Sequence, residues 1–148
     1  MKRAVILGEC QGGVVEASMP RPKEDWVLVK IHAAPLCTEY KMFTAGKKAA
    51  HLGHEAAGEV VEIAQPGRVK VGDRVAVMPQ YPCGTCTLCR SGEYIHCENV
   101  VDFTAFTGSD EGRATVAQYL LKQDWLLTPI PDDISYDHGA MACCGLGP

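Results

Sequence analysis

The sequence predicts a mainly β domain with short helices, arranged as an antiparallel barrel or sandwich. The chief observation is a series of about six to eight short runs of β-branched and aliphatic residues, most of them separated by glycine or proline. The second is that no strand is followed by a G-x-G-x-x-G turn, the fingerprint of a dinucleotide-binding α/β domain. The third is size, because 148 residues, 47% hydrophobic and 22% charged, suit one globular domain with its own core.

Each predicted strand is an apolar run between turn signals. The first two runs, 3–8 and 13–19, are expected to form a hairpin that turns at Gly12 and Gly13. The run from 25 to 34 alternates between two faces, as a half-buried strand does. The other predicted strands are 54–64, 72–79, 114–122 and 125–130.

The last predicted element is a helix from about Tyr136 to Cys144. Asp132, Asp133 and Ser135 precede it and are candidate N-caps. The apolar residues continue to the end of the sequence without a stop signal. We therefore expect this chain to be the front part of a longer protein.

Charge and hydropathy exclude several functions. The net charge is −4 and the lysines and arginines are scattered, so nucleic acid is not an expected partner. A membrane-spanning helix needs about 18 consecutive apolar residues, and no run in the sequence approaches that length. The N-terminal apolar run is too short for a signal peptide. We expect a cytoplasmic protein with no membrane partner. Thiols stay reduced in the cytoplasm, so clustered cysteines there favour metal binding over disulfides.

Four of the eight cysteines lie within residues 81–100, in the pattern C-x2-C-x2-C-x7-C. Four thiolates can close a tetrahedral zinc site, which leaves no open position for chemistry and serves to fold a small lobe. We predict a structural zinc site with Cys83, Cys86, Cys89 and Cys97 as its ligands. By itself this motif is equally compatible with a stand-alone structural zinc-binding or interaction module.

Further candidate ligands are dispersed along the chain. Cys37 follows a predicted strand in PLCTEY, and His54 and Glu55 begin the next strand in LGHEAAGEV. An open zinc site needs about three protein ligands and a free position. Taken singly, a buried cysteine or a histidine at a strand start is more often structural.

Several other residues are expected to have packing roles only. Cys10 is expected in the core, and so are the aromatic side chains Trp26, Phe103 and Phe106, which could alternatively form cleft walls. His51 could line a substrate cleft, although a surface position is the simpler interpretation.

The order of these motifs is more specific than any one of them. C-T-E is followed by G-H-E-A-A-G-E-V-V, then V-G-D-R-V, the four-cysteine run, and a helix with cysteines at its end. This order resembles the zinc-dependent alcohol dehydrogenases of the medium-chain dehydrogenase/reductase superfamily. The resemblance runs through nearly the whole chain and implies their N-terminal catalytic domain, a GroES-like distorted β-barrel.

The resemblance implies a set of site residues. Cys37 would be the first ligand of a catalytic zinc, His54 the second, and Glu55 a supporting or alternate ligand. Cys143 would be the third ligand, with Cys144 as the alternative one residue on. Such a site would activate a small-molecule alcohol or polyol that gives hydride to NAD or NADP.

One departure concerns the residues after Cys37. Many members of this family have Ser or Thr two residues after the first ligand, where it relays the alcohol proton. Here Thr38 is one residue after Cys37 and Glu39 is two residues after it. We expect Glu39 to take the relay position, with Thr38 as the fallback and a plain surface glutamate as the alternative.

The resemblance also implies an organisation. Residues 1–148 would be one catalytic domain with its zinc lobe at about 81–100, and the Rossmann cofactor domain would be absent from this chain. We therefore expect two zinc ions, no turnover by this chain alone, and possible association into a homo-oligomer. A zinc-independent reductase or chaperonin-like relative is the other alternative, and the predicted zinc ligands argue against it.

Overall fold

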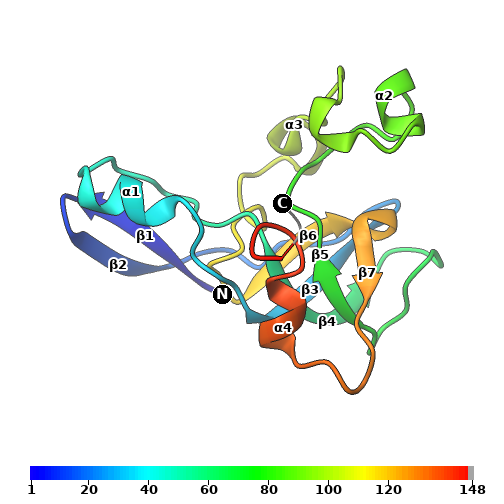
Figure 1. Ribbon diagram of the computed structural model, residues 1–148, viewed down its shortest axis with the longest axis horizontal. Coiled ribbons are helices and arrows are strands. Elements are labelled where there is room, and N and C mark those ends of the chain that lie inside the picture. Colours follow the sequence, from blue (N-terminus) through cyan, green and yellow to red (C-terminus); the bar gives the residue numbers. More distant parts are fainter. Residues whose placement is uncertain (147–148) are drawn as a thin grey trace.

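The computed structural model describes residues 1–146, and these form two antiparallel sheets with short helices (Figure 1). The strands are β1 (Lys2–Gly8), β2 (Gln11–Glu16), β3 (Trp26–Ala33), β4 (Ala56–Ile63), β5 (Arg74–Val77), β6 (Tyr119–Gln123) and β7 (Leu127–Pro129). The helices are α1 (Glu39–Thr44), α2 (Thr87–Arg90), α3 (Phe103–Thr107) and α4 (Tyr136–Ala140), with 3-10 turns η1 (Tyr94–His96) and η2 (Asp124–Leu126). The predicted class, mainly β with short helices, is confirmed.

The larger sheet has the strand order β6-β3-β4-β5-β7, and every neighbouring pair is antiparallel. Its inward side chains form the main core, a cluster dominated by valines that includes Val29, Val60 and Val75. Burial of these β-branched residues on a pleated surface is what the alternating runs of the sequence encode. No helix among the described residues is long and apolar enough to cross a membrane.

The hairpin β1–β2 lies with α1 at one end of the molecule, away from the larger sheet (Figure 1). Its turn is at Glu9 and Cys10, not at Gly12 and Gly13 as predicted, and Cys10 is exposed rather than in the core. The two glycines instead lie within β2, where a Cβ on Gly13 would come within 3.2 Å of the Leu7 side chain. This glycine therefore lies close to a neighbouring side chain rather than in a turn.

Trp26 and Phe103 lie in the core as predicted, and the partly buried Phe106 packs against them. Trp26 is buried with Phe103, and its ring centroid lies 4.9 Å from that of Phe106 and 5.5 Å from that of Tyr81. This second core connects β3 to α3 and to the segment that leads into the four-cysteine lobe.

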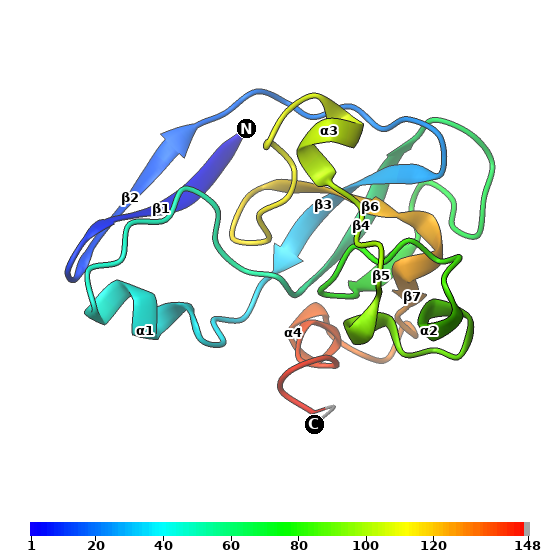
Figure 2. The same cartoon turned by 90° about the horizontal axis from the view of Figure 1, so that it is seen from above.

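Helix α4 is shorter than predicted, because it ends at Ala140 and turns follow it. Ser135 is its N-cap, and the Ser135 side chain accepts a hydrogen bond from the His138 N–H at 3.2 Å. Gly139 and Ala140 face the sheet, and Ala140 packs in a cluster with Ala57 and Ile130. In Figure 2, α4 and the turn after it lie at one side of the larger sheet.

Candidate metal sites and substrate cleft

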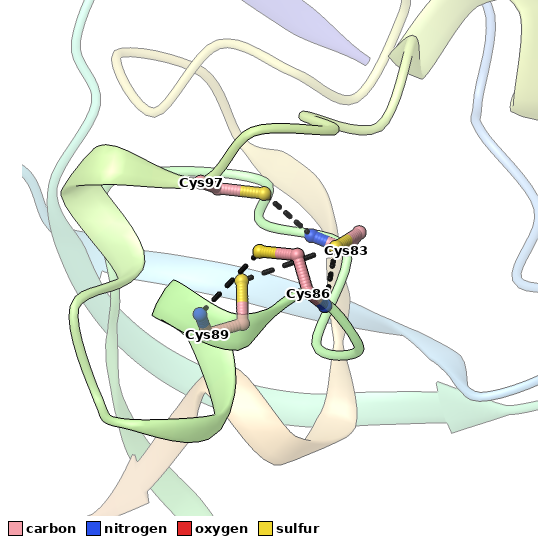
Figure 3. Close-up of side chains that lie close together, drawn as sticks. All are labelled: Cys83, Cys86, Cys89 and Cys97. Carbon is pink, nitrogen blue, oxygen red and sulfur yellow. Dashed lines mark hydrogen bonds between the residues drawn. The ribbon is translucent and has the colours of Figure 1, made fainter.

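The four-cysteine lobe, residues 81–100, brings its four sulfur atoms together (Figure 3). The ligand atoms of Cys83, Cys86, Cys89 and Cys97 all lie within 4.8 Å of one another. Backbone N–H groups point at the sulfurs, from Cys83 to Cys97 Sγ at 3.2 Å and from Cys89 to Cys86 Sγ at 3.4 Å. An all-sulfur set of this kind suits a closed zinc site.

The thiols of the lobe are not equivalent. Hydrogen bonds from the Thr85 hydroxyl and from the Thr85 and Cys86 N–H groups lower the pKa of Cys83 to about 6. Burial raises the pKa of Cys89 to about 12. Zinc binding requires the thiols to lose their protons, which the shift at Cys83 favours and the shift at Cys89 opposes.

A second group of metal-ligating side chains lies outside the lobe. Cys37, His54, Glu55 and Cys144 place one ligand atom each within 4.8 Å of the others, and we call them the mixed cluster. His54 Nε2 lies 3.2 Å from Cys144 Sγ and 3.8 Å from Glu55 Oε1. Two thiols, an imidazole and a carboxylate are a donor set that fits zinc.

The mixed cluster is assembled from three places in the chain. Cys37 lies between β3 and α1, His54 and Glu55 immediately precede β4, and Cys144 lies in the turns after α4. The Cys144 N–H donates to Glu55 Oε2 at 2.8 Å, which ties the end of the described chain to the start of β4. Glu55 is 2% exposed, so this bond satisfies a buried carboxylate.

The structure differs from expectation at the third ligand. Cys144, the alternative, joins the mixed cluster, whereas the Cys143 thiol donates to the Val77 carbonyl at 3.6 Å. Because α4 ends at Ala140, the following turns present position 144 and not 143 to His54.

Glu39 contacts two residues of the mixed cluster at once. Its Oε1 lies 2.8 Å from His54 Nδ1, and its Oε2 accepts a hydrogen bond from the Cys37 N–H at 2.9 Å. Burial opposes ionisation of Glu39, but these hydrogen bonds and one from its own backbone N–H outweigh it and lower the pKa of Glu39. Glu39 is thus a buried group and not a surface glutamate.

Thr38 is the residue that precedes α1. It occupies the N-cap position, but its side chain makes no capping hydrogen bond. Among the described residues, the hydroxyl therefore has no structural role at the helix end.

Two glycines flank His54 and Glu55 in the sequence. Gly53 has φ +86°, and a Cβ there would lie 2.0 Å from Thr115 Oγ1. A Cβ on Gly58 would lie 2.2 Å from the Lys30 carbonyl oxygen of the adjacent strand. Gly53 is therefore required by its positive φ and the Thr115 side chain, and Gly58 by the close approach of the neighbouring strand's backbone.

Beside His54 opens a cleft of about 650 Å³. Four segments of the chain line it, and the lining residues are Ala50, His51, Gly53, His54, Pro79, Gln80, Tyr81, Ile95, Val100 and Arg113. Of the residues considered for a cleft, His51 lines this one, whereas Trp26, Phe103 and Phe106 do not. Nothing in the sequence places the other lining segments together. Ile95 and Val100 come from the four-cysteine lobe, so the lobe supplies part of the cleft wall.

The segment that leads into the lobe is held by strand β6. Lys122 Nζ donates to the Gln80 carbonyl, and Gln123 Nε2 donates to the Pro82 carbonyl at 2.9 Å. Lys122 Nζ also lies 3.8 Å from the centroid of the Tyr81 ring. Burial of Lys122 was not predicted, although a lysine inside the apolar run YLLKQ was a visible signal.

The geometry can be compared with known proteins. The sequence model of the alcohol dehydrogenase GroES-like domain matches residues 23–132. The chain belongs to this family. Together with the relatives below, the match confirms the predicted N-terminal catalytic domain of the zinc-dependent alcohol dehydrogenases and its GroES-like fold.

Individual members of the family are similar over nearly the whole chain. The sorbitol dehydrogenase of Bacillus subtilis is 32% identical over 95% of this chain and 41% of its own length. The D-arabitol-phosphate dehydrogenase of Enterococcus avium is 32% identical over 93% of this chain and 41% of its own length. The structure of the alcohol dehydrogenase TADH from Thermus sp. ATN1 matches with a TM-score of 0.78 and 26% identity, covering 96% of this chain and 43% of TADH. The chain thus spans about two fifths of the length of these relatives.

Proposed function

We propose that this chain is the catalytic-domain portion of a zinc-dependent, NAD(P)-linked alcohol or polyol dehydrogenase. The observation that carries the proposal is the mixed cluster, whose His54 lines a cleft. It is present in addition to the four cysteines of the lobe. A stand-alone structural zinc module has no use for a second cluster of mixed donors, one of which, His54, lines a cleft. The names of two relatives, a sorbitol and a D-arabitol-phosphate dehydrogenase, support a polyol-type substrate.

The mixed cluster would hold the catalytic zinc. We propose Cys37, His54 and Cys144 as its ligands and Glu55 as a fourth donor, while Cys83, Cys86, Cys89 and Cys97 would hold the structural zinc. When bound at the mixed cluster, zinc supplies a Lewis acid that lowers the pKa of an alcohol and favours its oxidation. Cys143, the ligand first expected, has its thiol directed to a backbone carbonyl instead.

Glu39 would position the ligands rather than relay a proton. Both of its carboxylate oxygens are engaged, one by the His54 ring and one by the Cys37 N–H. A carboxylate on Nδ1 fixes the tautomer of His54 so that Nε2 can bind metal. This leaves the Thr38 hydroxyl, which makes no capping bond, as the proposed proton relay.

The remaining parts of the proposal concern the whole protein. The hydride acceptor would be NAD or NADP, bound by a Rossmann domain outside the 148 residues, as the family resemblance implies. Residues 1–148 would then be one catalytic domain. A cytoplasmic location fits the requirement of both clusters for reduced thiols.

Counting zinc tests the proposal directly. Elemental analysis of the purified chain should give about two zinc ions, falling to about one in Cys37→Ser and in Glu39→Gln purified at low zinc. One zinc in both the parent chain and Cys37→Ser would refute a second metal site. If two are found, the chain joined to the remainder of the B. subtilis sorbitol dehydrogenase should reduce NAD(P)+ with a polyol, and Cys37→Ser should abolish that reaction.

A further inference from the structure

The cleft beside His54 combines an apolar wall with a charged side chain. Ile95 and Val100, which are 68% and 62% exposed, give it an apolar wall from the four-cysteine lobe. Arg113 is the only permanently charged side chain among the described residues that line it, and no carboxylate does. A cleft of this kind favours a ligand with a carbon chain and a negative charge.

Arg113 is available to such a ligand. Its side chain is 45% exposed, and among residues 1–146 its ion pair joins Nη1 to Asp110 Oδ1 at 3.3 Å. A half-exposed pair contributes only about 0 to 1 kcal/mol. A phosphate or carboxylate can accept two parallel N–H bonds from a guanidinium, which is a stronger arrangement than this single contact.

His51 supplies a second polar group in the same cleft. Its Nε2 is buried and has no hydrogen-bond partner among the described residues. Burial, together with Arg3 and Arg113, lowers the pKa of His51 against the opposing charges of Glu111 and Asp110. The ring is therefore a neutral hydrogen-bonding group near pH 7, suited to a hydroxyl, and a bound ligand would satisfy its unpaired nitrogen.

We propose that the cleft selects an alcohol that carries an anionic group, a phosphate or a carboxylate, which Arg113 binds while His51 hydrogen-bonds a hydroxyl of the same molecule. This inference rests on the proposed function, because the reacting hydroxyl would lie toward His54 and the mixed cluster. It excludes cationic amino alcohols, which Arg113 would repel.

Three ligands with one carbon skeleton test the proposal. The zinc-loaded 148-residue chain would be titrated calorimetrically with D-arabitol, D-arabinonate and D-arabitol 1-phosphate. At least one anionic ligand should bind about tenfold or more tightly than the neutral polyol, as expected for a charge-assisted contact. The tighter of the two anions identifies the preferred group. Equal affinities for all three ligands, or binding of none, would overturn the proposal.

Variants of Arg113 and His51 test which residue produces the preference for an anionic ligand. Arg113→Gln should remove the preference for the anion, Arg113→Lys should keep most of it, and the exposed Arg21→Gln should leave it intact as a matched control. His51→Phe should weaken all three ligands by a similar factor. An anion preference that survives in Arg113→Gln contradicts the assignment. Zinc counts in Cys37→Ser test the proposed function separately, so two zinc ions with no effect of Arg113→Gln would refute this inference alone.

Discussion

Lys122 gives the sharpest quantitative prediction, because a lysine that is 1% exposed lies inside strand β6 without a carboxylate in hydrogen-bond contact. Burial lowers the pKa of Lys122 from 10.5 to about 7, while the charge of an ionised Cys143 acts in the other direction. In the unfolded chain, the pKa of Lys122 returns to its ordinary value of 10.5. Between the two pKa values the unfolded state binds more protons than the folded state.

The sign of the pH dependence follows from this difference. The cost of the buried charge is fully present below about pH 7, and it falls as the pH rises toward the unfolded pKa. One pKa unit corresponds to about 1.4 kcal/mol, so the free energy of unfolding should gain about 2 kcal/mol between roughly pH 7 and pH 9 from Lys122 alone. In Lys122→Met this gain should be absent. The variant also loses the bond to the Gln80 carbonyl, a pH-independent cost of about 1 kcal/mol.

Urea unfolding followed by tryptophan fluorescence at several pH values measures the effect. The difference in unfolding free energy between the parent chain and Lys122→Met should change by about 2 kcal/mol over the window. Lys70→Met, at an exposed lysine, serves as the control and should give a curve parallel to that of the parent chain. If the unfolding free energy of Lys122→Met also depended on pH as that of the parent chain does, the buried amine would not titrate in this range. The reasoning would then fail.

Two further predictions concern the mixed cluster. Cys144→Ser should lose about one zinc ion while Cys143→Ser keeps both, because the Cys144 sulfur lies at His54; the reverse result by elemental analysis would restore Cys143 as the ligand. Gly53→Ala should lower the free energy of unfolding by about 2 kcal/mol or more, since it combines a positive φ with a clash at Thr115. Gly72→Ala, with a positive φ but open space, should cost only about 1 kcal/mol, and equal urea-unfolding costs for the two variants would refute the clash.

Local sequence determined the fold class and the four-cysteine lobe. Short apolar runs between turn residues specify strands wherever one face is buried, so seven strands lie close to the predicted positions. The lobe is encoded by spacing, because its four ligands come from fifteen consecutive positions, Cys83 to Cys97, and the two C-x2-C steps bring neighbouring sulfurs together. The order of motifs was enough to indicate the family.

Tertiary structure decided which side chains meet outside the lobe. The choice between Cys143 and Cys144 depends on where α4 ends against β4, a packing outcome that adjacent cysteines in a sequence do not reveal. The contact of Glu39 with His54 and the approach of Arg113 to the cleft likewise join distant segments. Such contacts depend on how buried sheet and helix surfaces fit together, and that fit is a property of the folded chain rather than of any local pattern.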